Sequence, residues 1–471
     1  TVSGTATFAQ AATIAGITKA VVYSISDEQA NIPGSTTAAL NEAVDITITN
    51  NVTFAQAKII DDASNSGSNT YNISDTAANL AAGIVTSVTA INGAGTVASG
   101  IATASQGATL ASISQSIVYS ISDTAGNIVA NVGGLNESVN ITATDNCTFA
   151  QGKVIEDATN SQDITYNISD TATAIAAGIG SDNAVISSAG TIAANTYATV
   201  AELEIIGGDA KAITFSVKDT AANLAGATAA RILEAVNVIA TTDATVAQAA
   251  AIDTNTNEGA GGYNTYNIKD TAANIAAKSN VFLTKAGTVT VDGTATVAQA
   301  ETISALAKAV VYSISDIGDN ALTSAGTAYN EAVNITISGN LTLSKADVVR
   351  EASNSGTTTY VISDTSAAIS AAINETTGAT PDVETLNDAT TVTVTGTATF
   401  TQAATMAGVT KVIGYSISDE QANIPVSTTA ALNEAINITV TNNVTFAQAK
   451  IIDDASNSGS NTYNISDTAS A

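Results

Sequence analysis

Ten aspartates recur along the 471 residues of the chain at a step of about 48, and their carboxylates are its first candidates for chemistry. Each follows an aromatic residue by four positions in the pattern aromatic-x-(Ile/Val)-x-Asp. The ten are Asp27, Asp75, Asp123, Asp170, Asp219, Asp270, Asp316, Asp364, Asp419 and Asp467. A recurring carboxylate could cap a helix, bind calcium, or act as a catalytic acid or base. Because an active site breaks the symmetry of a repeat, ten equivalent copies predict a structural role, no catalytic residue and no enzyme activity.

Helix capping is the preferred interpretation of these aspartates. Alanine-rich stretches follow them, most plainly in residues 75–82, and an Asp at the start of a helix accepts hydrogen bonds from its free amides. An Asn also stands four residues after seven of the aspartates. These are Asn31, Asn79, Asn127, Asn223, Asn274, Asn320 and Asn423. We expect their side-chain amides to form a hydrogen-bond ladder between neighbouring segments.

Calcium binding is the alternative, and it draws on acidic residues in the loops. The weak candidates for metal ligands are Asp61, Asp62, Glu156 and Asp157. The loop that begins at Asp62 is similar to the start of an EF-hand, but Ile73 stands where the bidentate acid belongs. The single Cys147 is expected in the core, and one Cys without any His forms no disulfide and no thiolate or imidazole site. No cofactor other than Ca²⁺ is therefore considered.

A second signature, Thr-x-x-Gln or a close relative, stands between the aspartate motifs. Its threonines are Thr7, Thr53, Thr103, Thr148, Thr199, Thr245, Thr296, Thr342, Thr399 and Thr445. Glu202 and Lys345 replace the Gln in two copies. Thr three residues before Gln or Glu is a capping box, in which each side chain bonds the backbone amide of the other residue. The pattern predicts a short helix after each of these threonines.

The aromatic motif itself alternates like a strand with one buried face, as in residues 23–27, and residues 45–49 and 140–144 alternate in the same way. Strand, turn, helix and return together take about 24 residues. That length and the right-handed crossover rule predict an α/β solenoid of right-handed coils, with one long parallel sheet on one side. A regular parallel β-helix is the alternative fold, which the capping boxes and alanine-rich stretches argue against.

Repeats account for the whole of residues 1–471, so we expect a single elongated array. It contains ten units of about 48 residues, paired as repeats of about 97. Residues 393–471 repeat residues 1–79 with 66 of 79 positions identical. Soluble arrays usually carry a capping unit at each end, and this chain starts and stops within the pattern. We therefore expect a segment of a longer protein, or a subunit whose ends are covered by partners.

The amino-acid composition limits the kinds of molecule that this chain is expected to bind. The net charge is −28 with only 14 Lys and Arg, so nucleic acid and anionic lipid are expected to be repelled. No apolar run has membrane-spanning length, and membrane insertion is not expected. Self-association, end to end or side by side, is expected instead. The outward strand face is rich in Thr, Ser and Asn, as at Thr47 and Thr49, and offers an alternative function in binding ice, mineral or glycan surfaces.

Two strings carry a resemblance to a known class. Tyr-Asn-Ile-Ser-Asp-Thr-Ala-Ala-Asn-Leu (71–80) and Thr-Val-Thr-Gly-Thr-Ala-Thr-Phe (393–400) resemble repeats of giant bacterial surface proteins and adhesins secreted by the type I route. The resemblance covers essentially the whole chain. It implies an extracellular, cell-surface location and a calcium-dependent adhesive or coat-forming array, although the calcium nonapeptide Gly-Gly-x-Gly-x-Asp does not occur. The expected function is a structural rod in a surface layer, adhesin stalk or filament.

Overall fold

The computed structural model describes residues 1–254, 263–277, 281–323, 326–375 and 381–469. They form a mixed α/β fold with 23 α-helices and many short parallel strands. The chain divides into two compact units, each described by itself. The first consists chiefly of Thr1–Lys218 with Ala227–Val238, and the second of Asp219–Gly226 and most of the described chain after Val238.

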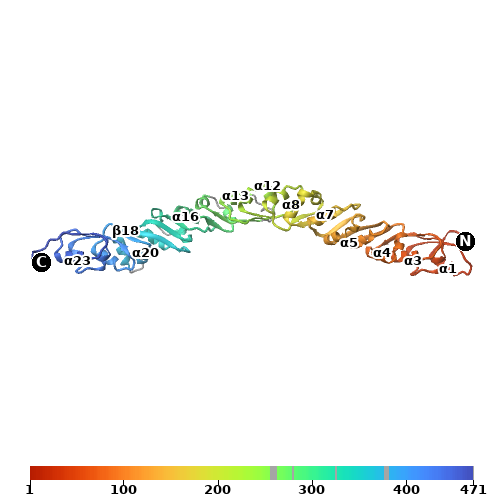
Figure 1. Cartoon of the computed structure of the whole chain (residues 1–471), viewed down its shortest axis with the longest axis horizontal. Coiled ribbons are helices and arrows are strands. Elements are labelled where there is room, and N and C mark those ends of the chain that lie inside the picture. Colours follow the sequence, from red (N-terminus) through yellow and green to blue (C-terminus); the bar gives the residue numbers. More distant parts are fainter. Residues whose placement is uncertain (255–262, 278–280, 324–325, 376–380, 470–471) are drawn as a thin grey trace. The chain divides into compact units, whose positions relative to one another are not determined.

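Short strands alternate with short helices throughout the first unit. Its strands are β1 (Thr5–Ala6), β2 (Ser24–Asp27), β3 (Ile46–Ile48), β4 (Asn69–Thr70), β5 (Ile73–Asp75), β6 (Val97–Ala102), β7 (Ile117–Asp123), β8 (Ile141–Cys147), β9 (Ile164–Asp170), β10 (Ile192–Ala194) and β11 (Val217–Asp219). Its helices are α1 (Phe8–Ala15), α2 (Ala38–Glu42), α3 (Phe54–Asp61), α4 (Ala77–Asn92, interrupted at Ser87), α5 (Ala104–Leu110), α6 (Ala125–Ala130), α7 (Phe149–Glu156), α8 (Ala172–Ser181), α9 (Asn183–Ser188), α10 (Val200–Ile206) and α12 (Ala229–Ile232). Elements α3, α4, α5 and α7 follow one another in chain order (Figure 1).

The second unit continues the alternation. Its strands are β12 (Val238–Ala240), β13 (Asn264–Thr265), β14 (Ile268–Asp270), β15 (Val289–Val291), β16 (Ile314–Ile317), β17 (Ile335–Leu341), β18 (Thr358–Thr365), β19 (Val392–Thr395), β20 (Ile413–Gly414), β21 (Ile417–Asp419), β22 (Ile438–Val440) and β23 (Asn461–Thr462). Its helices are α11 (Ala221–Gly226), α13 (Val246–Thr254), α14 (Ala272–Ala276), α15 (Val281–Lys285), α16 (Val297–Ser304), α17 (Thr327–Glu331), α18 (Leu343–Arg350), α19 (Ser366–Ile373), α20 (Val383–Asp388), α21 (Phe400–Met406), α22 (Ala430–Glu434) and α23 (Phe446–Asp453). We call one strand with the helical stretch that follows it a rung.

Within each sheet, neighbouring strands pair in parallel, which confirms the predicted parallel pairing. The order is β1-β2-β3-β4 and β5 through β10 in the first unit, and β14-β15, β16 through β20 and β21-β22-β23 in the second. Buried isoleucines lie opposite one another in this register, as Ile25 does with Ile46, and Ile121 with Ile141. Partner positions are mostly 19 to 24 residues apart, for example Ala6 with Ile25 and Ile73 with Val97, and reach 30 between Ile362 and Val392.

The expected single long sheet is instead divided into sheets of two to six strands. The reason is a break in pairing within a rung. Strands β3 and β4 pair at Ile46–Asn69 and Thr47–Thr70, and the next pairing is the isolated bridge between Val52 and Ile73, the first residue of β5. Four residues between Thr47 and Val52 face two residues between Thr70 and Ile73, so the ladder is interrupted there and the sheet of β1 to β4 ends before that of β5 to β10.

The aromatic residue lies in the core, as predicted, in every motif but the last, where Tyr463 is only partly buried. Among the described residues Tyr23, Tyr71, Tyr119, Tyr166, Tyr266, Tyr312, Tyr360 and Tyr415 are 1–2% exposed. The hydroxyl of each donates to a backbone carbonyl in or beside the helical stretch that follows its strand, as from Tyr71 to Ala90 O (2.8 Å) and from Tyr119 to Gly134 O (2.8 Å). A buried hydroxyl needs such a partner, so the tyrosine joins the strand to the helical stretch of the same rung by packing and by a hydrogen bond.

The second aromatic slot, after the capping Thr, is buried in some rungs and open in others. Phe8 and Phe400 are buried, whereas Phe446 is 61% exposed. Phe149 of α7 is half-buried and packs against the next helix at Gly178 of α8. A Cβ at Gly178 would lie 2.3 Å from the Phe149 ring, so only glycine leaves room for the ring there.

We predict opposite effects from two Gly→Ala changes in α8. Gly178→Ala should destabilise the chain by about 1–3 kcal/mol, because the added methyl overlaps the Phe149 ring. Gly180→Ala, where a Cβ meets nothing within 4 Å, should be neutral or stabilising by up to about 1 kcal/mol, because Ala favours the helix. Chemical denaturation measures both. Equal effects of the two changes would contradict this packing.

Candidate functional site

The repeated aspartate ends a strand, and its carboxylate joins two rungs. Asp123 ends β7, and its Oδ2 accepts a hydrogen bond from the backbone N–H of Ala104, the first residue of α5, at 3.0 Å. Its Oδ1 accepts from the N–H of Thr124 and from Nδ2 of Asn127, each at 2.8 Å. The first amide of a helix has no partner within the helix. Asp123 therefore supplies an acceptor to the helix of the preceding rung while it is held by its own rung.

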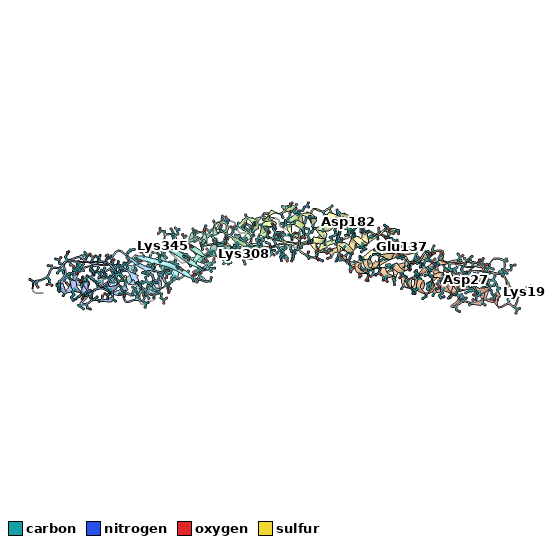
Figure 2. All side chains as sticks on the ribbon, viewed as in Figure 1. Lys19, Asp27, Glu137, Asp182, Lys308 and Lys345 are labelled. Carbon is teal, nitrogen blue, oxygen red and sulfur yellow. The ribbon has the colours of Figure 1, made fainter. Side chains whose placement is uncertain are left out.

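This arrangement, which we call the aspartate bridge, recurs with little change. The pairs of helix-start amide and carboxylate Oδ2, at 2.8–3.0 Å, are Phe8–Asp27, Phe54–Asp75, Ala104–Asp123, Phe149–Asp170, Val246–Asp270, Val297–Asp316, Leu343–Asp364, Phe400–Asp419 and Phe446–Asp467. Asp219 accepts from the N–H of Thr220 and from Asn223 in the same manner as its equivalents. Asp27 is labelled in Figure 2, at the first of the bridges.

The prediction that these aspartates cap the helix that follows them is wrong. The N-cap of α4 is Thr76, whose hydroxyl accepts from Asn79 N–H, and Thr124 caps α6 in the same way. The Asp still belongs to the strand, one residue before the N-cap, so its Oδ2 lies beside the neighbouring rung instead of beside its own helix. The carboxylate does cap a helix, but that helix precedes it in the chain.

The expected role of the seven asparagines is also wrong. Each donates through Nδ2 to Oδ1 of the Asp four residues earlier, at 2.7–2.8 Å, within one rung. The ladder between rungs is formed by other asparagines, which sequence reasoning missed. Asn72 and Asn167 precede the motif Ile, and their Oδ1 atoms accept from backbone amides 24 residues later, at Thr96 and Thr191. Asn140, Asn334 and Asn437 do the same 23 residues later. Their regular place before Ile was the available signal.

The predicted capping boxes are confirmed at most positions. Both hydrogen bonds of the box are present at Thr7, Thr53, Thr103, Thr148, Thr199, Thr296, Thr399 and Thr445, and also at Thr245 with Gln248. At Thr342 the helix α18 begins without a side-chain cap. Lys345 (Figure 2), which replaces the Gln, donates instead to the carbonyls of Gly318 and Asp319 in the preceding rung.

The acidic residues proposed as metal ligands lie at helix ends and already have protein partners. Asp62 forms an ion pair with Lys58 at 2.7 Å, and Asp157 pairs with Lys153 at 3.1 Å. Asp61 Oδ2 accepts from the Thr89 hydroxyl. Glu156 accepts from the hydroxyls of Ser188 and Tyr166. Within the described part of the chain, no group of three or more potential metal ligands comes together. Cys147 is fully buried, as expected.

The Thr- and Ser-rich strand face is present but not continuous. Ser122, Thr142 and Thr165 lie in register on adjacent strands, whereas a separate row of β5, β6 and β7 consists of Ser74, Ala98 and Val118. Several hydroxyl groups at the end of the strands already have hydrogen-bond partners within the protein. The hydroxyls of Thr49, Ser338 and Thr441 donate to the carbonyls of Asp27, Asp316 and Asp419 in the preceding rung.

Electrostatics favour the ionised aspartate bridge. Burial by itself raises the pKa of Asp123, but the hydrogen bonds from Asn127 and from the amides of Ala104 and Thr124 outweigh it, so its pKa lies below the ordinary value. The pKa values of Asp27, Asp270, Asp316 and Asp419 are lowered by the same set of bonds. In these five rungs the bridge is therefore a carboxylate that accepts three hydrogen bonds and stays charged at neutral pH.

Comparison with known proteins found no similar protein: no family model, no curated protein and no solved structure matches the chain. Among the described helices, none is both long and apolar enough to cross a membrane.

We predict that Asp123→Asn destabilises the chain by about 1–3 kcal/mol. The amide that replaces one carboxylate oxygen is a donor, and it would face either the Ala104 N–H or the Thr124 N–H and Asn127 donors. Asp163→Asn is the matched control, because the described structure shows no side-chain hydrogen bond at this exposed carboxylate. Urea unfolding measures both variants. A loss no larger than that of the control would show that the bridge contributes nothing to stability.

Stability should fall in acid. The folded pKa values of Asp27, Asp123, Asp270, Asp316 and Asp419 lie below the unfolded value of about 3.9, so the contribution of these residues is complete above that pH and is lost as the pH falls through the folded pKa. Thermal unfolding between pH 7 and pH 2.5 should give a constant melting temperature down to about pH 5 and a steep fall below about pH 4. A melting temperature unchanged at pH 2.5 would contradict this account.

Proposed function

We propose that this chain is a structural repeat protein without catalytic activity, in which α/β coils stack as a solenoid to form a rod. The observation that supports this most is the aspartate bridge. The same hydrogen bond joins one rung to the next at nine positions of the described chain. A structure built from equivalent contacts between neighbours can extend to any length, which is the property that a stalk, coat or filament needs.

The setting proposed for this rod is the bacterial cell surface, in a surface layer, an adhesin stalk or a filament. Three features support it. The repeat strings resemble those of secreted surface proteins, the net charge of −28 disfavours nucleic acid, and side chains at the rung interfaces are engaged with one another. Self-association of copies, end to end or side by side, belongs to the same proposal. A stalk or layer is made by joining such subunits.

The alternative of a rod that binds ice, mineral or glycan through its hydroxyl face has weaker support. A surface of that kind needs a regular row of free hydroxyls. Here one row of β5, β6 and β7 carries Ala98 and Val118 beside Ser74, and the hydroxyl of Thr49 is bonded to the carbonyl of Asp27. The structural role therefore remains the single function that we propose.

The particle shape tests the proposal. About twenty rungs at about 4.8 Å predict a particle on the order of 95 Å long, whereas a compact chain of this length has a radius of gyration of about 23 Å. Small-angle X-ray scattering and negative-stain images of the purified chain should show elongated particles. Round particles, or a scattering profile of a compact globule, would rule out the solenoid and the function that depends on it.

A further inference from the structure

One pair of positions breaks the equivalence of the rungs. Helices α3, α7, α13 and α18 occupy the same place in the repeat of about 97 residues, and the eighth residue of each is Asp61, Glu156, Asp253 or Arg350. We call this position A. It faces position B, four residues before the start of β6, β10, β15 or β19, where Gly93, Ser188, Lys285 or Asp388 stands.

The contacts between A and B change in chemistry from one repeat to the next. Glu156 Oε1 accepts from the Ser188 hydroxyl at 2.7 Å. Asp253 Oδ1 lies 3.0 Å from Lys285 Nζ, and Arg350 Nε lies 3.2 Å from Asp388 Oδ2. In the first repeat B is Gly93, and Asp61 bonds Thr89, four residues earlier. The third and fourth repeats thus use ion pairs of opposite polarity at equivalent positions.

The ion pairs are partly shielded from water. The side chain of Asp253 is 13% exposed and that of Arg350 is 20% exposed. Arg350 is also paired with Glu384, which stands at the position of Thr89, and lies 3.8 Å from Asp382. Shielded charges discriminate between partners more strongly than exposed ones, because like charges brought together there are poorly screened.

The stacking of repeats needs a contact that distinguishes one repeat from another, because the contacts that recur most often do not. The aspartate bridge and the apolar pairing of the strands have the same chemistry in most rungs. Near-identical repeats are prone to pair out of order, either within a chain or by exchange between two chains. If position A of one repeat faced position B of the neighbouring repeat, Arg350 would lie against Lys285, or Asp253 against Asp388. Each of these pairs brings like charges together.

We propose that positions A and B determine which repeat stacks on which, and that a second copy of this chain is the competing partner that they reject. The proposal rests on the stacked array proposed above. The reversed polarity of Asp253–Lys285 and Arg350–Asp388 is its central element. The charges at positions A and B specify the order in which the repeats stack, and the aspartate bridges supply stabilisation that is common to all repeats.

The test is the double variant Arg350→Asp with Asp388→Lys, which gives the fourth repeat the polarity of the third. The A–B pair is kept but the contacts of Arg350 with Glu384 and Asp382 are lost, so the melting temperature should fall less than in Arg350→Asp alone, which also leaves Asp388 facing a like charge. Because the two repeats now share one code, refolding from denaturant at rising protein concentration should increase exchanged oligomers roughly tenfold, which corresponds to about 1.4 kcal/mol of lost discrimination. Size-exclusion chromatography with light scattering measures the oligomers.

The matched control is Lys269→Asp with Asp292→Lys. It reverses an ion pair of 3.3 Å between two exposed residues, Lys269 in β14 and Asp292 just after β15, away from positions A and B, and it should refold as the parent does. A monomer fraction for the Arg350→Asp, Asp388→Lys variant equal to that of this control at every concentration would overturn the proposal.

A second variant covers a failure of the first to fold. Asp253→Arg with Lys285→Asp gives the third repeat the polarity of the fourth and should increase oligomers in the same way. If neither double variant folds, the positions act through local packing and the proposal is overturned. If the parent chain is elongated and the double variants stay monomeric, only this inference is overturned. If the parent chain itself is compact, the proposed function is overturned as well.

Discussion

The constraint on which the structure depends is the unpaired first amide of each short helix. A helix of about eight residues has few internal hydrogen bonds and cannot be stable alone in water. Here its first amide is bonded by a carboxylate of the next rung, as Ala104 is by Asp123, while its third amide is bonded by the capping Thr. Helix formation is therefore coupled to stacking, and neither a rung nor its helix is complete without the neighbour.

The same coupling accounts for the residue types of the repeat. Tyrosine is used in place of a purely apolar aromatic because its hydroxyl bonds the helical stretch that closes the rung, as Tyr71 does at Ala90. Asparagine follows the aspartate because its amide orients the carboxylate, as Asn127 does for Asp123. Isoleucine lies opposite isoleucine along the strands. The interface between rungs is thus built from one apolar ladder and a few hydrogen bonds that are repeated.

The sequence predicted the local features well and the contacts between rungs poorly. The capping box at Thr103 spans three residues, so its spacing alone predicts both of its hydrogen bonds. The bridge from Asp123 to Ala104 spans 19 residues, and it depends on where a strand ends relative to a neighbouring helix. The bond from Asn127 to Asp123 is local, and the spacing of four residues was a sufficient signal for it. The opposite charges of Arg350 and Asp253 become apparent only when helices α18 and α13 are aligned as equivalent elements of the repeat.

Residue-resolved hydrogen exchange at neutral pH tests the central claim most directly. The first amide of a helix exchanges freely unless something outside the helix bonds it. We predict that the amides of Ala104 and Phe149 exchange as slowly as those of the paired strands, and that the next amides, of Ser105 and Ala150, exchange much faster. Equal and rapid exchange at Ala104 and Ser105 would contradict the aspartate bridge and the account of stacking built on it.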